Sequence, residues 1–440
     1  MHSIEFALLA AENYSIFLGF LILSIFIHIF LIRHFAIGLL DPIVTAIIGN
    51  IFAFATALFV FYVDDSSREY IFSFFTAELA FWAGFIMLAP SGASIVILLA
   101  KIKPIPVLPK REFPFLVLWL MFIFLKVMQF TFVGIPLFAF VRIGMATDSG
   151  GLGVFQTSAS LIFPLLIYYA TFLYIAGRLN RIRGYLFIIT MIAMILLDGS
   201  KSTFIPLAQS VFIYAIVLGG RDTFNKSNIF INKNISILIV IAISMTIGTI
   251  FFKENDISES IALLGRRLLA FGDAYYLGYP NGVIESLDQT KYLEVLFYPT
   301  LSTLRLIDFN KVSESLGVML AQSVHNNFEG GGPNARHNIL GLYLFGEIGF
   351  VFSFIIGMLI GVMRRLLLIF SGGFYSRYLC AFILISASVF FTDAPLGIYV
   401  TALGLIFLAS WVILAKAINQ GCTRRYFVGK TKSVSKAMLF

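Results

Sequence analysis

The residues of this chain that could do chemistry gather in a short polar segment, residues 330–338, with the sequence GGGPNARHN. Its glycines and proline predict a turn, and the apolar run that begins at Ile339 predicts a helix directly after it. Helix starts attract anions, because their first N–H groups have no partner within the helix. Arg336 adds a cation, and His337 adds an imidazole whose ordinary pKa of about 6.5 allows proton transfer near neutral pH. The segment therefore predicts an anion site beside a titratable side chain.

His337 also has a structural interpretation, because a lone histidine at a helix start more often caps or packs than catalyses. Three of the five histidines, His2, His28 and His34, lie near the other end of the chain. His325 lies in the same polar segment as His337 and is an alternative candidate. The residues alone leave these interpretations open.

Three further cations and one acid suit a phosphate or sugar ligand. Lys201 lies in the short sequence GSKST, where glycine allows close backbone approach and hydroxyls flank the cation, although a lysine at a helix end more often extends to the membrane surface. Arg266 and Arg267 interrupt an apolar run at 261–271 and could clamp a phosphate or bind anionic lipid headgroups. Asp273 could orient this pair or bind a sugar hydroxyl.

The composition indicates a membrane protein. The chain has 440 residues, of which 59% are hydrophobic and 12% charged, whereas soluble domains carry about a quarter charged residues. Apolar stretches long enough to cross ~30 Å of hydrocarbon recur along the chain. The net charge of +8 is a topology signal, because Lys and Arg collect on the cytoplasmic side, and a nucleic-acid partner is not expected.

Several enzyme classes leave no motif in this sequence. There is no Gly-rich nucleotide loop, no HExxH, no Cys/His cluster and no Asp-x-Asp pair, so neither a metal nor a cofactor is expected. Cys380 and Cys422 predict neither a disulfide framework nor a metal site. Glu78 lies inside an apolar span, which keeps a proton-coupled transporter open.

Hydropathy predicts an all-α polytopic membrane protein with roughly eleven transmembrane helices. The predicted spans lie near residues 15–32, 43–63, 71–99, 113–132, 154–177, 185–197, 204–218, 235–252, 338–362, 378–391 and 396–414. Pro90 predicts a kink in the third span. Loops on the predicted inner side carry about twice as many Lys and Arg residues as the outer ones, which places the N-terminus outside and the C-terminus in the cytoplasm.

This pattern divides the chain into four parts. Residues 1–252 hold the first eight spans, and the segment before the first span lacks a basic start, which predicts an anchor rather than a cleaved signal. Residues 253–337 form one large outer loop, whose apolar stretches at 261–271 and 293–306 predict short interfacial helices. Residues 338–415 hold the last three spans, and residues 416–440 form a basic cytoplasmic tail.

Residues 333–350, with the sequence PNARHNILGLYLFGEIGF, resemble the signature of O-antigen polymerases of the Wzy type and of O-antigen ligases. In that superfamily a histidine, usually followed by asparagine, ends the large periplasmic loop. Residues 199–202, GSKS, are similar to the short Gly-Ser-Arg element of the family, with Lys201 where arginine is usual. The length, the span count and the single large outer loop also fit the family.

The resemblance implies a GT-C-like fold and a metal-independent glycosyltransferase at the periplasmic face of the bacterial inner membrane. Such an enzyme polymerises undecaprenyl-pyrophosphate-linked oligosaccharide repeat units into O-antigen or a similar surface polysaccharide. By that resemblance His337 is the base or orients the acceptor hydroxyl, and Lys201 with Arg266 or Arg267 binds the pyrophosphate. Asp273, Arg336 and Asn338 complete the expected substrate-binding residues. Expected partners are membrane lipid, a chain-length regulator and a flippase.

Two alternatives remain at this stage. An O-antigen ligase uses the same donor but transfers the glycan to lipid A–core. A lipid-oligosaccharide flippase or proton-coupled transporter predicts charged residues distributed through the spans, with none essential in one outer loop.

Overall fold

The computed structural model describes residues 3–101, 112–138, 153–198, 204–220, 223, 225, 269–287, 292–308, 314–324, 332–369 and 372–437, with side chains as far as residue 415 in the last range. Within these ranges the regular structure is helical and no strand occurs. In this part of the chain, eight helical segments are long and apolar enough to cross a membrane. The prediction of an all-α polytopic membrane protein is therefore confirmed.

The predicted number of roughly eleven spans stays a prediction. The helix Phe204–Gly220 coincides with a predicted span but is shorter than the eight, and α8 (Arg181–Leu197) has only 17 residues. The predicted span at 235–252 lies outside the described residues.

The helices of the first half, up to residue 175, are α1 (Ser3–Glu12), α2 (Tyr14–Ile32), α3 (Pro42–Val63), α4 (Ile71–Leu88), α5 (Gly92–Lys101), α6 (Glu112–Phe132) and α7 (Val154–Ile175). Short 3-10 helices lie at η1 (Asp65–Tyr70) and η3 (Pro136–Phe138).

The helices of the second half beyond α8 include five short elements, η5 (Ala270–Gly272), α11 (Asp273–Gly278), η6 (Pro280–Gly282), α12 (Val283–Ser286) and α13 (Tyr292–Thr303). They continue with α14 (Leu316–Val324), α15 (His337–Phe345), η9 (Gly346–Ile348), α16 (Gly349–Ile369), α17 (Phe374–Thr392) and α18 (Ala394–Ala437).

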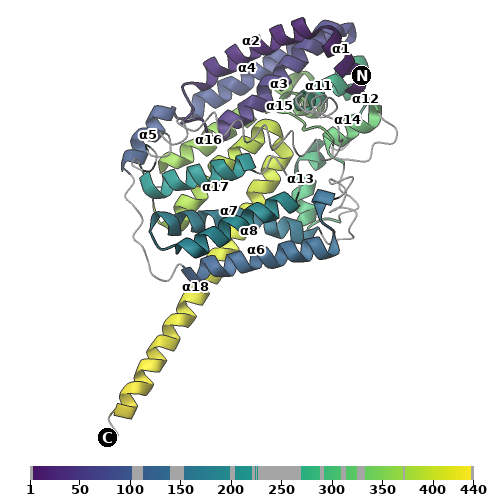
Figure 1. Cartoon of the computed structure of the whole chain (residues 1–440). Coiled ribbons are helices and arrows are strands. Elements are labelled where there is room, and N and C mark those ends of the chain that lie inside the picture. Colours follow the sequence, from purple (N-terminus) through teal and green to yellow (C-terminus); the bar gives the residue numbers. More distant parts are fainter. Residues whose placement is uncertain are drawn as a thin grey trace.

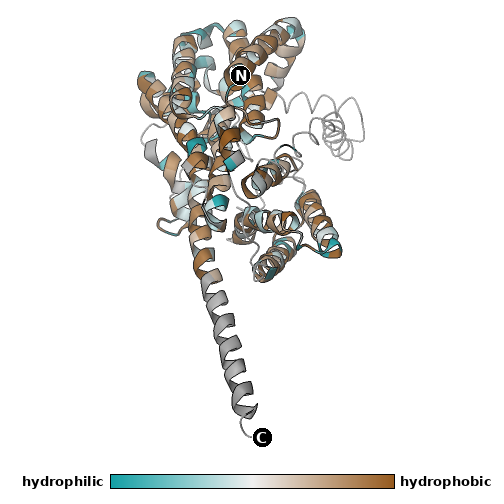
Figure 2. Cartoon of the chain, turned by 90° about the vertical axis from the view of Figure 1, so that its left-hand side faces the viewer, coloured by the Kyte–Doolittle hydropathy of each residue, from teal (hydrophilic) through white to brown (hydrophobic). Residues whose placement is uncertain are grey.

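Two buried cores divide the helices into two groups, which are visible as separate bundles in Figure 2. The first bundle contains α2, α3, α4 and α16, together with α1, α11 and α15. In it α4 runs along α16 at a distance that only glycine permits, because a side-chain carbon at Gly84 would overlap the carbonyl of Phe354. A carbon at Gly357 would likewise overlap the carbonyl of Phe81. Small residues at a membrane helix contact allow this backbone approach.

The second bundle contains α6, α7, α8 and the helix Phe204–Gly220. Its core is rich in aromatic rings, among them Tyr168, Tyr214, Phe374 and Tyr378. Helix α17 contributes buried side chains to both cores, with Phe382 in the second and Phe390 in the first. It therefore joins the two bundles.

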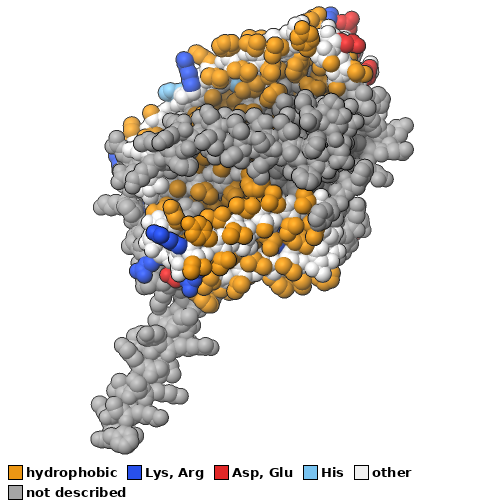
Figure 3. Space-filling view, viewed as in Figure 1, with side chains coloured by type: hydrophobic (Ala, Val, Ile, Leu, Met, Phe, Trp, Pro, Cys, Tyr) orange, Lys and Arg blue, Asp and Glu red, His pale blue; other side chains and the backbone are white. Residues whose placement is uncertain are grey.

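Different short helices lie at the two ends of the first bundle. Helices α1, α11, α12 and α14 gather at the end where the N-terminus lies, and α5 lies at the opposite end (Figure 1). Near α5, Asp41 caps α3 and accepts two hydrogen bonds of 2.9 Å from Arg364, a pair with almost no exposure. Apolar side chains cover much of the described surface in Figure 3, as lipid contact requires. Helix α18 continues past the bundle as one 44-residue helix.

Two predicted spans are interrupted in the structure, one near Pro90 and one at Gly346. Where a kink is predicted at Pro90 the structure has a helix break, because α4 ends at Leu88 and α5 begins at Gly92. The predicted continuous span at 338–362 is divided into α15 and α16, because Gly346 adopts a positive φ of 57° that ends α15. Of the predicted interfacial helices, the second is α13, and residues 261–268 of the first lie outside the described residues.

Candidate functional site

The start of α15 places three candidate residues side by side. Helix α15 begins at His337, which confirms the helix predicted after the glycine turn. Arg336, His337 and Asn338 are all buried, with 2–3% of each residue exposed. The preceding segment is held tightly, because a side-chain carbon at Gly332 would overlap the backbone at Gly317 of α14. Gly332 therefore lets the chain pass close to α14, and the polar residues that follow it are buried.

Arg336 fastens the start of α15 to α3 and to the short helix η5. Its Nε donates to the carbonyl of Phe271 at 3.2 Å, and its Nη2 donates to the carbonyl of Gly49 at 3.0 Å. Its Nη1 donates to the side-chain oxygen of Asn50. Burial lowers the pKa of the guanidinium, while nearby Tyr275, Glu78 and Asp273 raise it. Three of the five N–H donors of the guanidinium therefore bond to protein acceptors on α3 and η5.

The ring of His337 is enclosed on several sides. It stacks on Phe81 with ring centroids 4.2 Å apart and planes within 6°. Its Nδ1 lies 3.1 Å from the hydroxyl of Ser353, and its Nε2 lies 3.7 Å from a carboxyl oxygen of Glu78. A carboxyl beside one ring nitrogen and a hydroxyl beside the other fix the orientation of an imidazole. Proton transfer through Nε2 is the chemistry that this arrangement allows.

Asn338 joins two buried groups of the same cluster. Its Nδ2 donates to Glu78 at 3.1 Å, and its Oδ1 accepts from the hydroxyl of Tyr275 at 3.0 Å. Glu78 lies on α4 and Tyr275 on α11, so the amide links a candidate membrane helix to a helix of the predicted outer loop.

Asp273 opens α11 and belongs to the same electrostatic group. Burial raises the pKa of its carboxyl to about 7, against the lowering effects of a backbone hydrogen bond at Ala274 and of the Arg336 cation. Its neighbour Gly272 packs on Thr56, where a side-chain carbon would overlap. Asp273 is therefore a half-buried carboxyl that interacts electrostatically with Arg336 and has a pKa near neutral.

The polar network continues into α2 and α3. The side chain of Asn50 lies 3.0 Å from Nε2 of His28, and Nδ1 of His28 lies 2.8 Å from the carbonyl of Ser24. The hydroxyl of Ser24 donates to the carbonyl of Ile51 at 2.9 Å. Hydrogen bonds thus run from α2 through Asn50 and Arg336 to η5.

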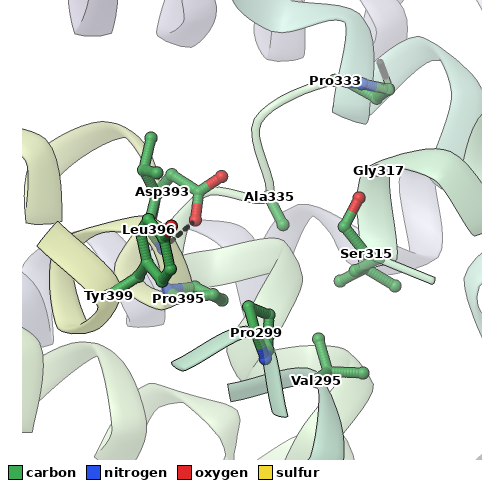
Figure 4. A pocket seen from close by; sticks show the side chains of 11 residues that line it. Val295, Pro299, Ser315, Gly317, Pro333, Ala335, Asp393, Pro395, Leu396 and Tyr399 are labelled. Carbon is green, nitrogen blue, oxygen red and sulfur yellow. Dashed lines mark hydrogen bonds between the residues drawn. The ribbon is translucent and has the colours of Figure 1, made fainter. Parts of the chain in front are cut away.

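A cavity of about 270 Å³ lies next to the segment that leads to His337, between α13, α14 and the start of α18 (Figure 4). Its wall includes Pro333 and Ala335, with Asp393 and Tyr399 opposite. Burial raises the pKa of Asp393, whose carboxylate accepts from the N–H of Leu396. Arg336, His337 and Asn338 do not line this cavity. A small ligand there would lie beside the cluster without touching the His337 ring.

The structure thus brings together four of the seven predicted site residues: Asp273, Arg336, His337 and Asn338. The other three, Lys201, Arg266 and Arg267, lie outside the described residues, as does His325. Within the described ranges no group of three or more His, Cys, Asp or Glu side chains could hold a metal.

Sequence reasoning missed several members of the cluster. His28 and Asn50 are single polar residues inside predicted spans, and such residues usually face the bundle interior. Glu78 was recognised only as an acid that a transporter could use. Ser353 and Tyr275 carry no such signal, because both residue types are common in membrane helices and interfaces.

Comparison with known proteins does not place this chain in a family: no family model, no curated protein and no solved structure matches it.

Proposed function

We propose that this chain is a glycosyltransferase that polymerises undecaprenyl-pyrophosphate-linked oligosaccharide repeat units at the periplasmic face of the bacterial inner membrane. The observation that carries the proposal is the buried cluster at the start of α15, which joins Arg336, His337 and Asn338 to Glu78 and Asp273. Ionisable groups buried among membrane helices are costly, and such groups usually mark a functional site. The resemblance of residues 333–350 to the polymerase signature supplies the reaction.

In the proposed reaction the acceptor sugar hydroxyl attacks the anomeric carbon of the donor glycan. The new glycosidic bond forms as the bond to the pyrophosphate oxygen breaks, and undecaprenyl pyrophosphate leaves with the electron pair. His337 takes the proton of the attacking hydroxyl, and Lys201 with Arg266 or Arg267 offsets the charge of the leaving group. Arg336 and Asn338 position the histidine and Glu78, since their polar atoms are already bonded to protein groups.

The enclosure of His337 sets a condition on this mechanism. Its side chain is 1% exposed, and Glu78 lies against the nitrogen that would accept the proton. Substrate binding must therefore separate Glu78 from Nε2 before the acceptor hydroxyl can reach the ring.

The test uses purified protein in lipid nanodiscs with a defined lipid-linked repeat unit, and it measures chain length on gels. We expect His337→Ala to lower the rate of polymer formation by at least ~100-fold, the usual contribution of a general base. His34→Ala, at an exposed histidine of the same chain, is the matched control and should keep full activity. Normal chain lengths from a correctly inserted His337→Ala protein would show that the catalytic assignment is wrong.

The ligase alternative shares the donor and the leaving group, so the same cluster serves it equally well. Deleting the gene separates the two functions. Loss of a polymerase leaves lipid A–core capped with single repeat units, whereas loss of a ligase leaves bare core.

A transporter is the second candidate, because charged residues are buried at several levels of the helices. Besides Glu78, the Asp41–Arg364 pair and the Lys126–Asp198 pair lie within or at the ends of spans. A proton-coupled transporter or flippase predicts this distribution. Substrate-driven proton uptake into proteoliposomes that Glu78→Gln abolishes, without formation of new glycosidic bonds, would favour transport over polymerisation.

A further inference from the structure

A second polar cluster lies in the other bundle, between α6, α7 and α8. The Nζ of Lys126 on α6 lies 2.5 Å from Oδ2 of Asp198 at the end of α8, and it also donates to Gln129 at 3.1 Å. Lys126 is only 6% exposed and lies within a predicted membrane span, roughly 9 Å from the end of its helix. A charge at this depth is costly unless it is paired, and such charges commonly serve a ligand or ion path.

These residues form one side of a cavity of about 260 Å³. Its wall includes Phe122 and Lys126 of α6, Gln156, Ser160 and Phe163 of α7, and Asp198 of α8. The volume lies just below the range of ~300–1,000 Å³ that is usual for small-ligand sites. The cavity therefore suits a ligand of a single ring rather than an oligosaccharide or a lipid chain.

The wall of the cavity offers unused donors and acceptors. Oδ1 of Asp198 is buried and has no hydrogen-bond partner among the described residues. The Lys126 ammonium has three donors, of which Gln129 and Asp198 take two. The exposed amide of Gln156 supplies one donor group and one acceptor group, and the Ser160 hydroxyl keeps its acceptor capacity while donating to a carbonyl.

The charge balance selects the class of ligand. A phosphate would meet a lysine already neutralised by a carboxylate, and Oδ1 of Asp198 would repel it. A metal cation would find one carboxylate with an ammonium beside it, and oxygen ligands alone are what hard cations need. A neutral polyhydroxy ring fits, because each hydroxyl both donates and accepts. The rings of Phe122 and Phe163, with centroids 5.8 Å apart, offer an apolar surface for its C–H face.

We propose that this cavity binds one neutral sugar ring through Lys126, Asp198 and Gln156, with Phe122 and Phe163 packed against the ring. The ring could arrive as a free sugar or as the headgroup of a glycolipid. The site lies in a different bundle from the α15 cluster, and the proposal does not depend on the reaction assigned to that cluster.

Saturation-transfer NMR on the whole protein in nanodiscs tests the proposal, and maltoside and glucoside detergents are avoided because their headgroups would compete. The probes are the methyl glycosides of glucose, galactose, mannose and N-acetylglucosamine. Further arms use nanodiscs that contain a monoglucosyl diacylglycerol, and inorganic phosphate as a competitor whose binding is followed by loss of the methyl-glycoside signal. Ser160→Leu fills the cavity, and Gln156→Ala removes an exposed polar wall group. Thr190→Leu is the control, because Thr190 is a half-buried residue of α8 that does not line the cavity and whose hydroxyl donates to Leu186 of its own helix.

We expect at least one methyl glycoside or the glycolipid headgroup to bind the wild-type protein. Ser160→Leu and Gln156→Ala should each weaken that binding at least tenfold, while Thr190→Leu leaves it unchanged. Failure of every sugar probe to bind, binding that Ser160→Leu does not affect, or preferential binding of phosphate would each overturn the proposal. The result is independent of polymerase activity, which the binding assay does not measure.

Discussion

At the residue scale, the amide of Asn338 links α4 to α11 through two hydrogen bonds. An amide carries a donor and an acceptor on one side chain, so it can satisfy both Glu78 and Tyr275 at once. An apolar residue of the same size would remove the hydrogen bonds that Asn338 makes with both of those buried groups. The residue type, rather than its volume, is what the position requires.

We therefore predict that Asn338→Leu lowers the stability of the folded protein by about 3 kcal/mol, because an unpaired buried polar group costs ~1–3 kcal/mol. Thermal unfolding of the purified protein, followed by tryptophan fluorescence, measures the change. Asn334→Leu is the control in the same segment, since Asn334 is exposed. Equal melting temperatures for the two variants would contradict the linking role.

Asp273 makes a second residue-scale prediction, on pH dependence. Burial raises the pKa of this carboxyl from its ordinary 3.8 to about 7, so the folded protein binds a proton that the unfolded chain releases. The stability that this proton contributes is fully present below pH 3.8 and is lost as the pH rises to about 7.

We expect the melting temperature of the wild-type protein to fall between pH 5 and pH 8 by more than that of Asp273→Asn, which has no titrating group at this position. Asp65→Asn changes an exposed carboxyl and should follow the wild-type profile. Parallel profiles for the wild type and Asp273→Asn would contradict the assignment of the proton to Asp273.

At the scale of elements, the contact between α4 and α16 decides where the cluster is placed. Glu78 and Phe81 lie on α4, and Ser353 lies on α16, so the His337 ring is held between side chains of these two helices. Gly84 and Gly357 set the spacing of the helices. A wider contact would move Glu78 and Phe81 away from His337.

Gly84→Leu is predicted to destabilise the protein by at least ~3 kcal/mol, because overpacking a tight contact costs ~1–3 kcal/mol and here the obstacle is backbone, which cannot rotate away. Gly19→Leu is the control, since Gly19 on α2 has no atom within 4 Å of the added carbon. Yield of monodisperse protein and melting temperature are the measurements. Similar behaviour of the two leucine variants would show that the close approach is not required.

At the scale of the whole molecule, helices α16, α17 and α18 contribute buried side chains to both bundles, and each bundle holds its own polar cluster. The α15 cluster lies near the end that α1, α11 and α14 cover (Figure 1). Orientation follows from the Lys and Arg bias of the loops, which predicts that this end faces the periplasm.

Reporter fusions test this orientation. Green fluorescent protein at the C-terminus should be fluorescent, because the basic tail is predicted to lie in the cytoplasm. Alkaline phosphatase inserted at residues 288–291 of the outer loop should be active, whereas the same insertion at residues 102–110 of a predicted inner loop should be inactive. The opposite pattern would invert the proposed location of the active site.

The sequence by itself determined the class of this protein and the residues of its central motif. Hydropathy identified the membrane helices because lipid requires long apolar segments with internally satisfied backbone. The glycine turn placed a helix start at His337, as observed, because turn chemistry is local.

Only the tertiary structure decided what the motif touches. Asn50, Glu78 and Ser353 are distant from residue 337 in the sequence and reach the cluster through helix packing. The division between α15 and α16 also escaped prediction, because only Gly346, Glu347 and Ile348 separate two apolar helices, and the positive φ of Gly346 is not visible in the sequence. Lys126 and Asp198 are 72 positions apart, and only the packing of α6 against α8 and α7 turns two isolated charges into the wall of one cavity.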